Sequence, residues 1–293
     1  MNAVALPRAL LALYLAAFFL FLFGPLLVMA VTAFNISAYP QVLPFAGFTL
    51  HWFADLPRDD DLMLGLGNSL RIGAMVVVLS VPLGLAGALL MHQVHARARA
   101  LYYLVTVSPV LTPGIIIGIA TVIFWRDLTG MTHTRFLYDG ILLTVLGQSS
   151  FIAAYCMLIF TARLQRFDPA LAEAALDLGA SRTQVFAHIL LPFLRPAVLS
   201  AAALAFLSSF ENYNTTTFSI LADKTLTTVL AGRVRQGTTP ALSALAVAIV
   251  AVSVLGAVAY EVLRRHEEGR RAAAQRVARE AERQEMQSAA QPA

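Results

Sequence analysis

Charge is what this chain lacks most. Asp, Glu, Lys and Arg make up only 13% of its 293 residues, whereas a soluble domain has about a quarter. Its single cysteine, Cys156, rules out an internal disulfide and is expected to be a small packing residue. The sequence has neither a Gly-x-x-x-x-Gly-Lys-Ser/Thr phosphate loop nor a His-Glu-x-x-His motif. We therefore predict no catalytic residue, no metal site, no cofactor bound by this chain and no nucleic-acid partner.

Long uncharged windows take the place of the missing charge. Residues 9–54, 72–96, 100–125, 140–162, 196–210 and 236–260 contain no Asp, Glu, Lys or Arg. About 20 apolar residues in helical form cross a bilayer core, where the backbone must satisfy its own hydrogen bonds. The windows predict an all-α membrane protein with six transmembrane helices, at about residues 9–33, 70–91, 101–125, 141–161, 196–221 and 242–263. The first apolar run is too long for a signal peptide and is expected to be retained.

An even number of spans puts both termini on one side of the membrane. The arginines and lysines of the connecting loops divide evenly between the two sides, but four more arginines follow the last predicted span, at positions 264, 265, 270 and 271. The positive-inside rule therefore favours cytoplasmic termini. Residues 264–293 are expected to be a charged cytoplasmic tail, either a simple topology anchor or a segment that meets anionic lipid head groups.

A more polar stretch, residues 165–195, separates two very apolar runs, and local rules predict its structure. Asp168 followed by Pro169 is typical of a helix start. Gly179 is expected to end that helix in a left-handed conformation. Ser181 and Gln184 have the spacing of a capping box and predict a second short helix, closed near Pro192. The prediction is two short helices joined by a tight corner at the membrane surface.

Glu173 and Asp177 are one helical turn apart in the first of these helices, so they share a face. Such a pair most simply indicates a solvated surface. The alternative is a face that meets basic groups on a partner protein.

The spacing of this stretch also resembles a known motif. Glu-Ala-Ala at 173–175 is followed after three residues by Gly179, and after nine more by Ile189 and then Leu-Pro at 191–192. This pattern resembles the cytoplasmic EAA loop of type I ABC-importer permeases, the membrane subunits that carry no ATPase of their own. The resemblance implies that eight residues form the surface that docks on the ATPase: Glu173, Ala174, Ala175, Asp177, Gly179, Ile189, Leu191 and Pro192.

The same resemblance implies a fold, partners and a location. It implies the type I ABC-importer permease fold with a cytoplasmic coupling helix, in the bacterial inner membrane. Implied partners are an ATPase dimer that binds ATP and Mg, a second homologous permease, a periplasmic substrate-binding protein and the lipid bilayer. The likeness covers about residues 68–263, so we expect residues 1–67 to be a first helix with a periplasmic loop.

Segments 208–216, 226–229 and 239–241 further resemble the PotC-type permeases of spermidine/putrescine importers. The resemblance implies import of a small solute such as a polyamine. The alternatives are another solute, such as ferric iron or an amino acid derivative, or a stand-alone secondary transporter, which would need inverted repeats with charged midplane residues.

The fifth predicted span contains an acidic residue among other polar side chains. On a continuous helix, Ser208, Glu211, Asn212, Thr215 and Ser219 would form one stripe. An ionisable residue at membrane depth is costly and usually faces a cavity or a partner. Two hypotheses follow: the stripe lines the translocation path and Glu211 attracts a cationic substrate, or Glu211 anchors an interface between helices.

The segment before the second predicted span, residues 35–67, is rich in aspartate: Asp55, Asp59, Asp60 and Asp61. A solvated loop is the simpler prediction for it. Contact with the periplasmic binding protein is the alternative.

Overall fold

The computed structural model describes residues 8–256, 258–259 and 261–262. Within these residues the chain is helical and forms no strand, apart from an isolated bridge between Asn35 and Phe48. Two compact units can be distinguished, one of residues 57–237 and one that combines the described parts of residues 1–56 and 238–293. The predicted tail, residues 264–293, lies outside the described part of the chain.

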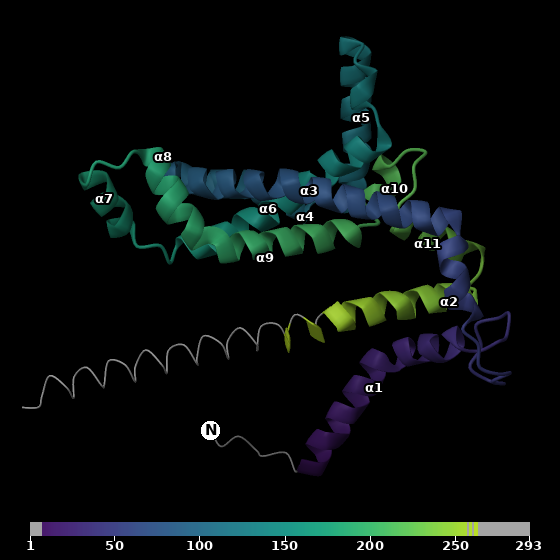
Figure 1. Cartoon of the computed structure of the whole chain (residues 1–293). Helices are drawn as coiled ribbons and strands as arrows, with labels where there is room; N and C mark the ends of the chain where they lie inside the picture. Colours follow the sequence, from purple (N-terminus) through teal and green to yellow (C-terminus); the bar gives the residue numbers. More distant parts are fainter. Residues whose placement is uncertain (1–7, 257, 260, 263–293) are drawn as a thin grey trace, which may run out of the picture. The chain divides into compact units, whose positions relative to one another are not determined.

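The unit of residues 57–237 contains most of the helices of the described chain. Its elements are α3 (Asp60–Gln93), α4 (Ala96–Leu111), α5 (Gly114–Thr132), η2 (Arg135–Leu137), α6 (Gly140–Leu164), α7 (Pro169–Asp177), α8 (Arg182–Val185), η3 (Phe186–Leu190), α9 (Leu191–Phe210), α10 (Thr216–Ser219) and α11 (Leu226–Gln236). Helices α7 and α8 lie at one end of this unit, and α10 and α11 lie at the other (Figure 1).

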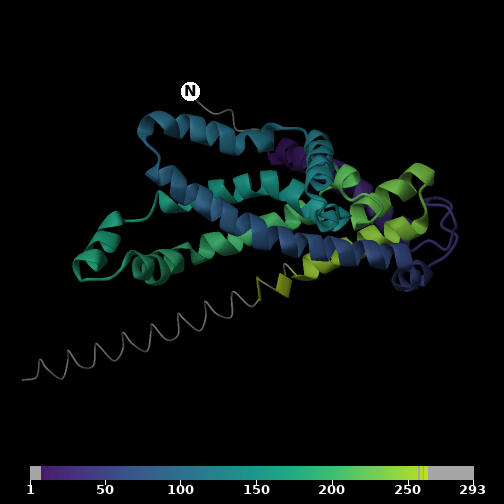
Figure 2. The same cartoon turned by 90° about the horizontal axis from the view of Figure 1, so that it is seen from above.

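Three long helices, α3, α6 and α9, build the core of this unit and run side by side in both views (Figures 1 and 2). Fully buried Val76, Ile152, Phe160 and Leu194 belong to this core. Cys156 packs among them, as the sequence predicts. Small residues allow the close approach, because a Cβ added at Gly84 of α3 would overlap the Cβ of Cys156.

The third predicted span, residues 101–125, is not one helix. It is divided into α4 and α5, because Pro113 has no backbone N–H and forces the residue before it into an extended conformation. Thr112 accordingly has φ −83° and ψ 131°. Of the two, α5 is long and apolar enough to cross a membrane, and in Figure 1 it projects away from the α3–α6–α9 core.

In the described part of the chain, five helices have the length and composition of membrane spans: Leu10–Ala33, Asp60–Gln93, Gly114–Thr132, Gly140–Leu164 and Arg182–Phe210. A shorter apolar helix, Pro240–Gly256, covers most of the sixth predicted span, whose last residues are only partly described. The fifth span begins earlier than predicted and ends at Phe210, not near Leu221.

The other unit contains α1 (Arg8–Ala33), α2 (His51–Asp55), the helix Pro240–Gly256 and the loop between α1 and α2; η1 (Leu56–Arg58) leads out of it to α3. A buried hydrogen bond from Thr32 to Ser243 (2.9 Å) joins α1 to the C-terminal helix. Asn35 organises the loop: its carbonyl accepts from the Trp52 indole, and its side chain accepts from the Ala46 N–H. The loop after α1 is therefore an ordered structure.

Candidate functional site: the 165–195 segment and the outer end of α9

The 165–195 segment begins with α7, and the predicted helix start is confirmed. Asp168 is the N-cap, and its carboxylate accepts from the Ala170 N–H at 3.0 Å. Pro169 follows at the first helical position, where its missing N–H costs nothing. The chain therefore leaves α6 and re-enters a helix after a short, capped turn.

The corner after α7 is a complete Schellman motif. The Gly179 N–H donates to the Leu176 carbonyl (2.9 Å), and the Ala180 N–H donates to the Ala175 carbonyl (3.0 Å), which is the bonding pattern that defines the motif. Gly179 has φ +86°, and nothing lies within 4 Å of a Cβ added there. Glycine is therefore required for its backbone conformation and not for lack of space.

The second half of the segment differs from the prediction. The Ser181–Gln184 capping box is present, with hydrogen bonds of 2.7 and 3.3 Å. However, α8 does not close at Pro192. It continues through the π-helical turn η3 into α9, so one helical stretch runs from Arg182 to Phe210. Pro192 lacks an N–H and would clash with the carbonyl four residues earlier in a regular helix; the wider π turn absorbs this proline.

The corner presents apolar and acidic groups together at the surface. Leu178, beside Gly179, is 89% exposed, and Leu171 is 55% exposed. Glu173 and Asp177 are also exposed. The helical angles put Leu171 and Leu178 on one face of α7 and the two carboxylates on another. The corner therefore exposes an apolar face and an acidic face.

The remaining residues of the motif lie on the helical side of the corner. Ile189 is half-buried in η3, and Leu191 is 38% exposed at the start of α9. A surface hollow of about 470 Å³ lies beside the corner, lined by Leu178, Gly179, Ala180, Gln184, Val185, His188 and Ile189. Two of the motif residues, Gly179 and Ile189, therefore line this hollow.

An arginine that the sequence reasoning missed connects this segment to the core. Arg163, at the end of α6, donates through Nε and Nη2 to the Phe193 carbonyl (3.2 and 3.1 Å). Its guanidinium also lies 4.2 Å from the Phe193 ring centroid, and Phe167 packs edge-on against the same ring. These contacts join the two ends of the 165–195 segment. An arginine in the last turn of an apolar span was the available signal.

The outer end of α9 does not carry the predicted helical stripe. The helix ends at Phe210, Glu211 is its C-cap, and a non-helical stretch leads to α10. We call residues 211–215 the break segment. Glu211 is exposed, Ser208 and Asn212 are half-buried, and Thr215 and Ser219 are fully buried. The continuous stripe was therefore wrong in geometry, because the chain leaves the helix inside the expected span.

A buried polar cluster holds the chain after the break, and sequence reasoning missed its centre, Gln148. The Gln148 amide donates to Thr216 Oγ1 (2.8 Å), and its carbonyl oxygen accepts from the Ser209 hydroxyl. One turn earlier on α6, Thr144 and Ser219 share a hydrogen bond of 3.0 Å. A glutamine in a charge-free window was the signal for such a cluster, since buried side-chain amides need partners.

These contacts show where residues 216–220 lie along α6. Residues 216 and 219 meet α6 at residues 148 and 144, and Ile220 meets α6 at its first residue, Gly140. After the break the chain thus follows the first eight or so residues of α6, a rise of about 12 Å. Irregular backbone at membrane depth needs protein or a water-filled cavity around it. Here Gly114 and Gly118 of α5 pack directly on Thr215.

Comparison with known proteins identifies the family. The model of the binding-protein-dependent transport system inner membrane component matches residues 80–269. This chain belongs to that family. It is a type I ABC-importer permease of the PotC-related kind.

The permease has curated relatives over most of its length. It is 32% identical to the putrescine transport system permease protein PotI of Escherichia coli K12 over 258 residues, which cover 86% of this chain and 90% of that protein. It is 23% identical to the spermidine/putrescine permease PotC of the same organism, with coverages of 86% and 92%. A PotC homolog of Mycoplasma genitalium is 29% identical over 68% of each chain.

The fold also matches solved structures. A chain of a bacterial ABC transporter that imports the acidic polysaccharide alginate superimposes with a TM-score of 0.64, at 18% identity, over 86% of the permease and 92% of that chain. A chain of an alginate transporter in complex with its substrate-loaded periplasmic protein gives 0.65 at 20% identity. At these identities the likeness shows a shared fold.

Proposed function

We propose that the permease is one membrane-spanning subunit of an ATP-driven importer for a polyamine such as putrescine or spermidine. The proposed substrate is supported by the 32% identity to a protein named as a putrescine permease, over nearly the whole of both chains. A separate ATPase dimer binds ATP and Mg, a second permease completes the pore, and a periplasmic binding protein delivers the substrate.

The ATPase docks on the α7 corner. An exposed leucine, two exposed carboxylates and a rigid glycine corner supply an apolar contact, a charge preference and a fixed angle. Arg163 transmits displacement of this corner to α6 and α9, because it joins both ends of the segment. The corner faces the cytoplasm, which gives six spans with both termini inside; the sixth span is the helix that begins at Pro240.

Translocation takes place along the face that the end of α9 presents. Glu211, Ser208 and Asn212 retain accessible surface and are our candidates for residues that line the path. The burial of Thr215 and Ser219 favours a packing role for these two. The Glu211 carboxylate would attract a cationic substrate, and Glu211→Gln should then slow putrescine uptake; uptake with unchanged kinetics would count against this role and favour a helix anchor.

Uptake of labelled putrescine and spermidine tests the proposal. Cells that lack the gene are compared with cells complemented by the wild type or by Gly179→Asp. Loss of uptake with the gene and its return only with the wild type would support a polyamine importer coupled through the corner. Uptake that does not depend on the gene would exclude the polyamine and direct the search to another solute of the same transporter class.

A further inference from the structure

The inference concerns α11, an amphipathic helix at the end of the 57–237 unit opposite α7 (Figure 1). It begins with a capping box between Thr225 and Thr228, and its buried residues are Leu226 and Val229. Helix α11 follows the break segment in the chain and packs on the first turns of α3. It therefore lies between the surface at this end of α3 and the candidate path residues at the end of α9.

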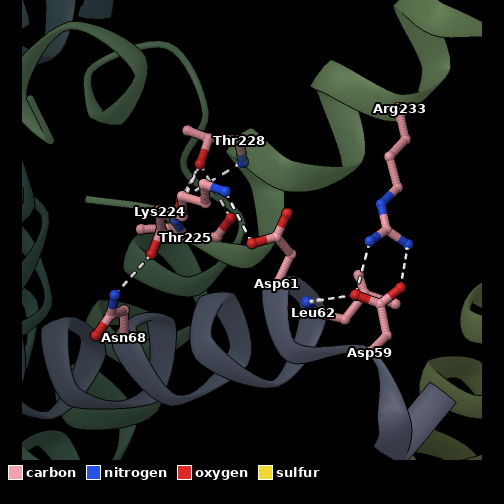
Figure 3. Close-up of polar contacts among 8 residues, drawn as sticks. All are labelled: Asp59, Asp61, Leu62, Asn68, Lys224, Thr225, Thr228 and Arg233. Atoms are coloured by element: carbon pink, nitrogen blue, oxygen red, sulfur yellow. Dashed lines mark hydrogen bonds and ion pairs between the residues drawn. The ribbon is translucent and has the colours of Figure 1, made fainter. Parts of the chain in front are cut away.

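Helix α11 is firmly attached to the first turns of α3 (Figure 3). Asp59 caps α3 by accepting from the Leu62 N–H, and it also receives both terminal nitrogens of Arg233, at 2.6 and 2.7 Å. Arg233 holds the pKa of Asp59 below its ordinary value, chiefly through this hydrogen bond. Asp61 pairs with Lys224 at 2.8 Å. The predicted loop was therefore wrong for residues 60–67, which are helical, but the side chain of the ion-paired Asp61 is still 52% exposed.

Backbone contacts complete the attachment. The Ser69 hydroxyl accepts from the Leu226 N–H in a buried bond of 2.9 Å, and the Asn68 amide donates to the Lys224 carbonyl at 2.8 Å. Gly65 allows the two backbones to meet, since a Cβ there would lie 3.0 Å from the Thr225 carbonyl carbon. With these supports, α11 is a fixed platform rather than a mobile loop.

From this platform two side chains reach the break segment. The Thr227 hydroxyl donates to the Asn212 carbonyl at 3.1 Å, and Arg235 Nη2 donates to the Tyr213 hydroxyl at 2.8 Å. Tyr213 lies two residues from Glu211. The break segment is thus held by α11, and the residues on either side of it, Ser209 and Thr216, are held by Gln148.

Arg235 and its neighbour Arg233 differ in the hydrogen-bond partners of their guanidinium groups. Arg233 has a carboxylate fork, whereas the partner that the described residues offer to the exposed guanidinium of Arg235 is a neutral phenol. A carboxylate can form two parallel charge-assisted hydrogen bonds with an arginine, as Asp59 does with Arg233, whereas the Tyr213 hydroxyl accepts only one from Arg235. An acidic group brought to this surface would therefore take Arg235 from Tyr213.

We propose that Arg235 receives a carboxylate of the docked substrate-binding protein and in doing so releases Tyr213 and the break segment. Arg235 is a positioning residue, because its hydrogen bond keeps Tyr213 of the break segment in place until the partner arrives. This inference rests on the proposed function, since it requires α11 to face the periplasm. The carboxylate of the binding protein pairs with Arg235 only when Arg235 has let go of Tyr213. Docking of the binding protein therefore shifts the equilibrium toward the form in which Tyr213 is released.

The test uses the reconstituted complex of the permease with its partner permease, ATPase and binding protein, with putrescine as substrate. ATP hydrolysis is measured against binding-protein concentration. Tyr213→Phe removes only the hydroxyl, so basal hydrolysis should rise severalfold and the half-maximal binding-protein concentration should fall or stay constant. Arg235→Gln should also raise basal hydrolysis, but it should raise the half-maximal concentration about fivefold or more. Arg235→Lys should restore most of the affinity.

Lys224→Gln is the matched control, because it removes a cation from the same surface without touching the break segment. Its half-maximal concentration should remain within about twofold of wild type. Equal affinity in Arg235→Gln and Lys224→Gln would overturn the proposal, and so would unaltered basal hydrolysis in Tyr213→Phe. An Arg235 effect that appears only in anionic lipid would also overturn it by making the lipid the partner. If the wild type shows no stimulation at all, the proposed function itself fails.

Discussion

Gly179 provides the sharpest test of how the corner works, because its requirement is purely conformational. An added Cβ meets nothing within 4 Å, but the residue has φ +86°. An alanine there would therefore suffer only the left-handed backbone penalty, about 1–2 kcal/mol. That energy corresponds to roughly a 5- to 30-fold decrease in the equilibrium constant for forming the corner.

Three substitutions separate backbone strain from charge. Asparagine tolerates the left-handed region better than alanine. We therefore expect Gly179→Asn to retain most of the transport activity, and Gly179→Ala to reduce transport by a factor of up to about 30. Gly179→Asp has a similar shape to asparagine but adds a third carboxylate near Glu173 and Asp177, and it should insert normally yet uncouple hydrolysis from transport.

The assay is substrate uptake per ATP hydrolysed by the purified complex, with membrane insertion checked by immunoblot. Equal loss of coupling in Gly179→Asn and Gly179→Ala would refute the conformational argument. Wild-type transport by Gly179→Asp would refute the role of the corner altogether.

Three further predictions follow from packing and charge. Gly84→Ala should destabilise the permease by about 1–3 kcal/mol through overpacking, whereas Gly67→Ala, with open space around it, should be neutral or slightly stabilising; equal melting temperatures in detergent would contradict this. Gln148→Leu should cost about 1–3 kcal/mol by leaving the buried Ser209 hydroxyl without its acceptor, and Ser150→Ala, whose hydroxyl bonds to the Gly147 carbonyl of its own helix, should cost less than half as much in the same melt. Because the pKa of Asp59 is lowered, its ion pair should stabilise α11 above about pH 4 and weaken in stronger acid. The protection factors of the α11 amides against hydrogen exchange, which are corrected for the intrinsic pH dependence of exchange, should therefore be constant from pH 5 to 8 and fall only in acid.

Much of the 165–195 segment was predictable because it is built by local rules. The Asp168 cap, the Gly179 corner and the Ser181–Gln184 box depend on neighbours within a few residues, and each is confirmed. The continuation of α8 into α9 was missed, because a π turn that accommodates Pro192 cannot be recognised from helix propensity.

The outer end of α9 was harder to predict for a different reason. The run from Glu211 to Thr216 is polar, but such a run fits a polar stripe on a continuous helix as well as it fits a break, so composition alone does not distinguish them. The break depends on contacts with residues far along the chain: Gln148 on α6, Gly118 on α5 and Thr227 on α11. Long-range partners of this kind do not leave a local pattern.

Chemical cross-linking tests the central claim, that the α7 corner docks on an ATPase, most directly. The only native cysteine, Cys156, is fully buried. A cross-link to a cysteine introduced at the exposed Leu178 can therefore be assigned to that position. We predict that Leu178→Cys cross-links to the co-expressed ATPase, and that Met131→Cys, 81% exposed on α5, does not. A complex in which Leu178→Cys gives no ATPase cross-link, or gives no more than Met131→Cys, would contradict the account.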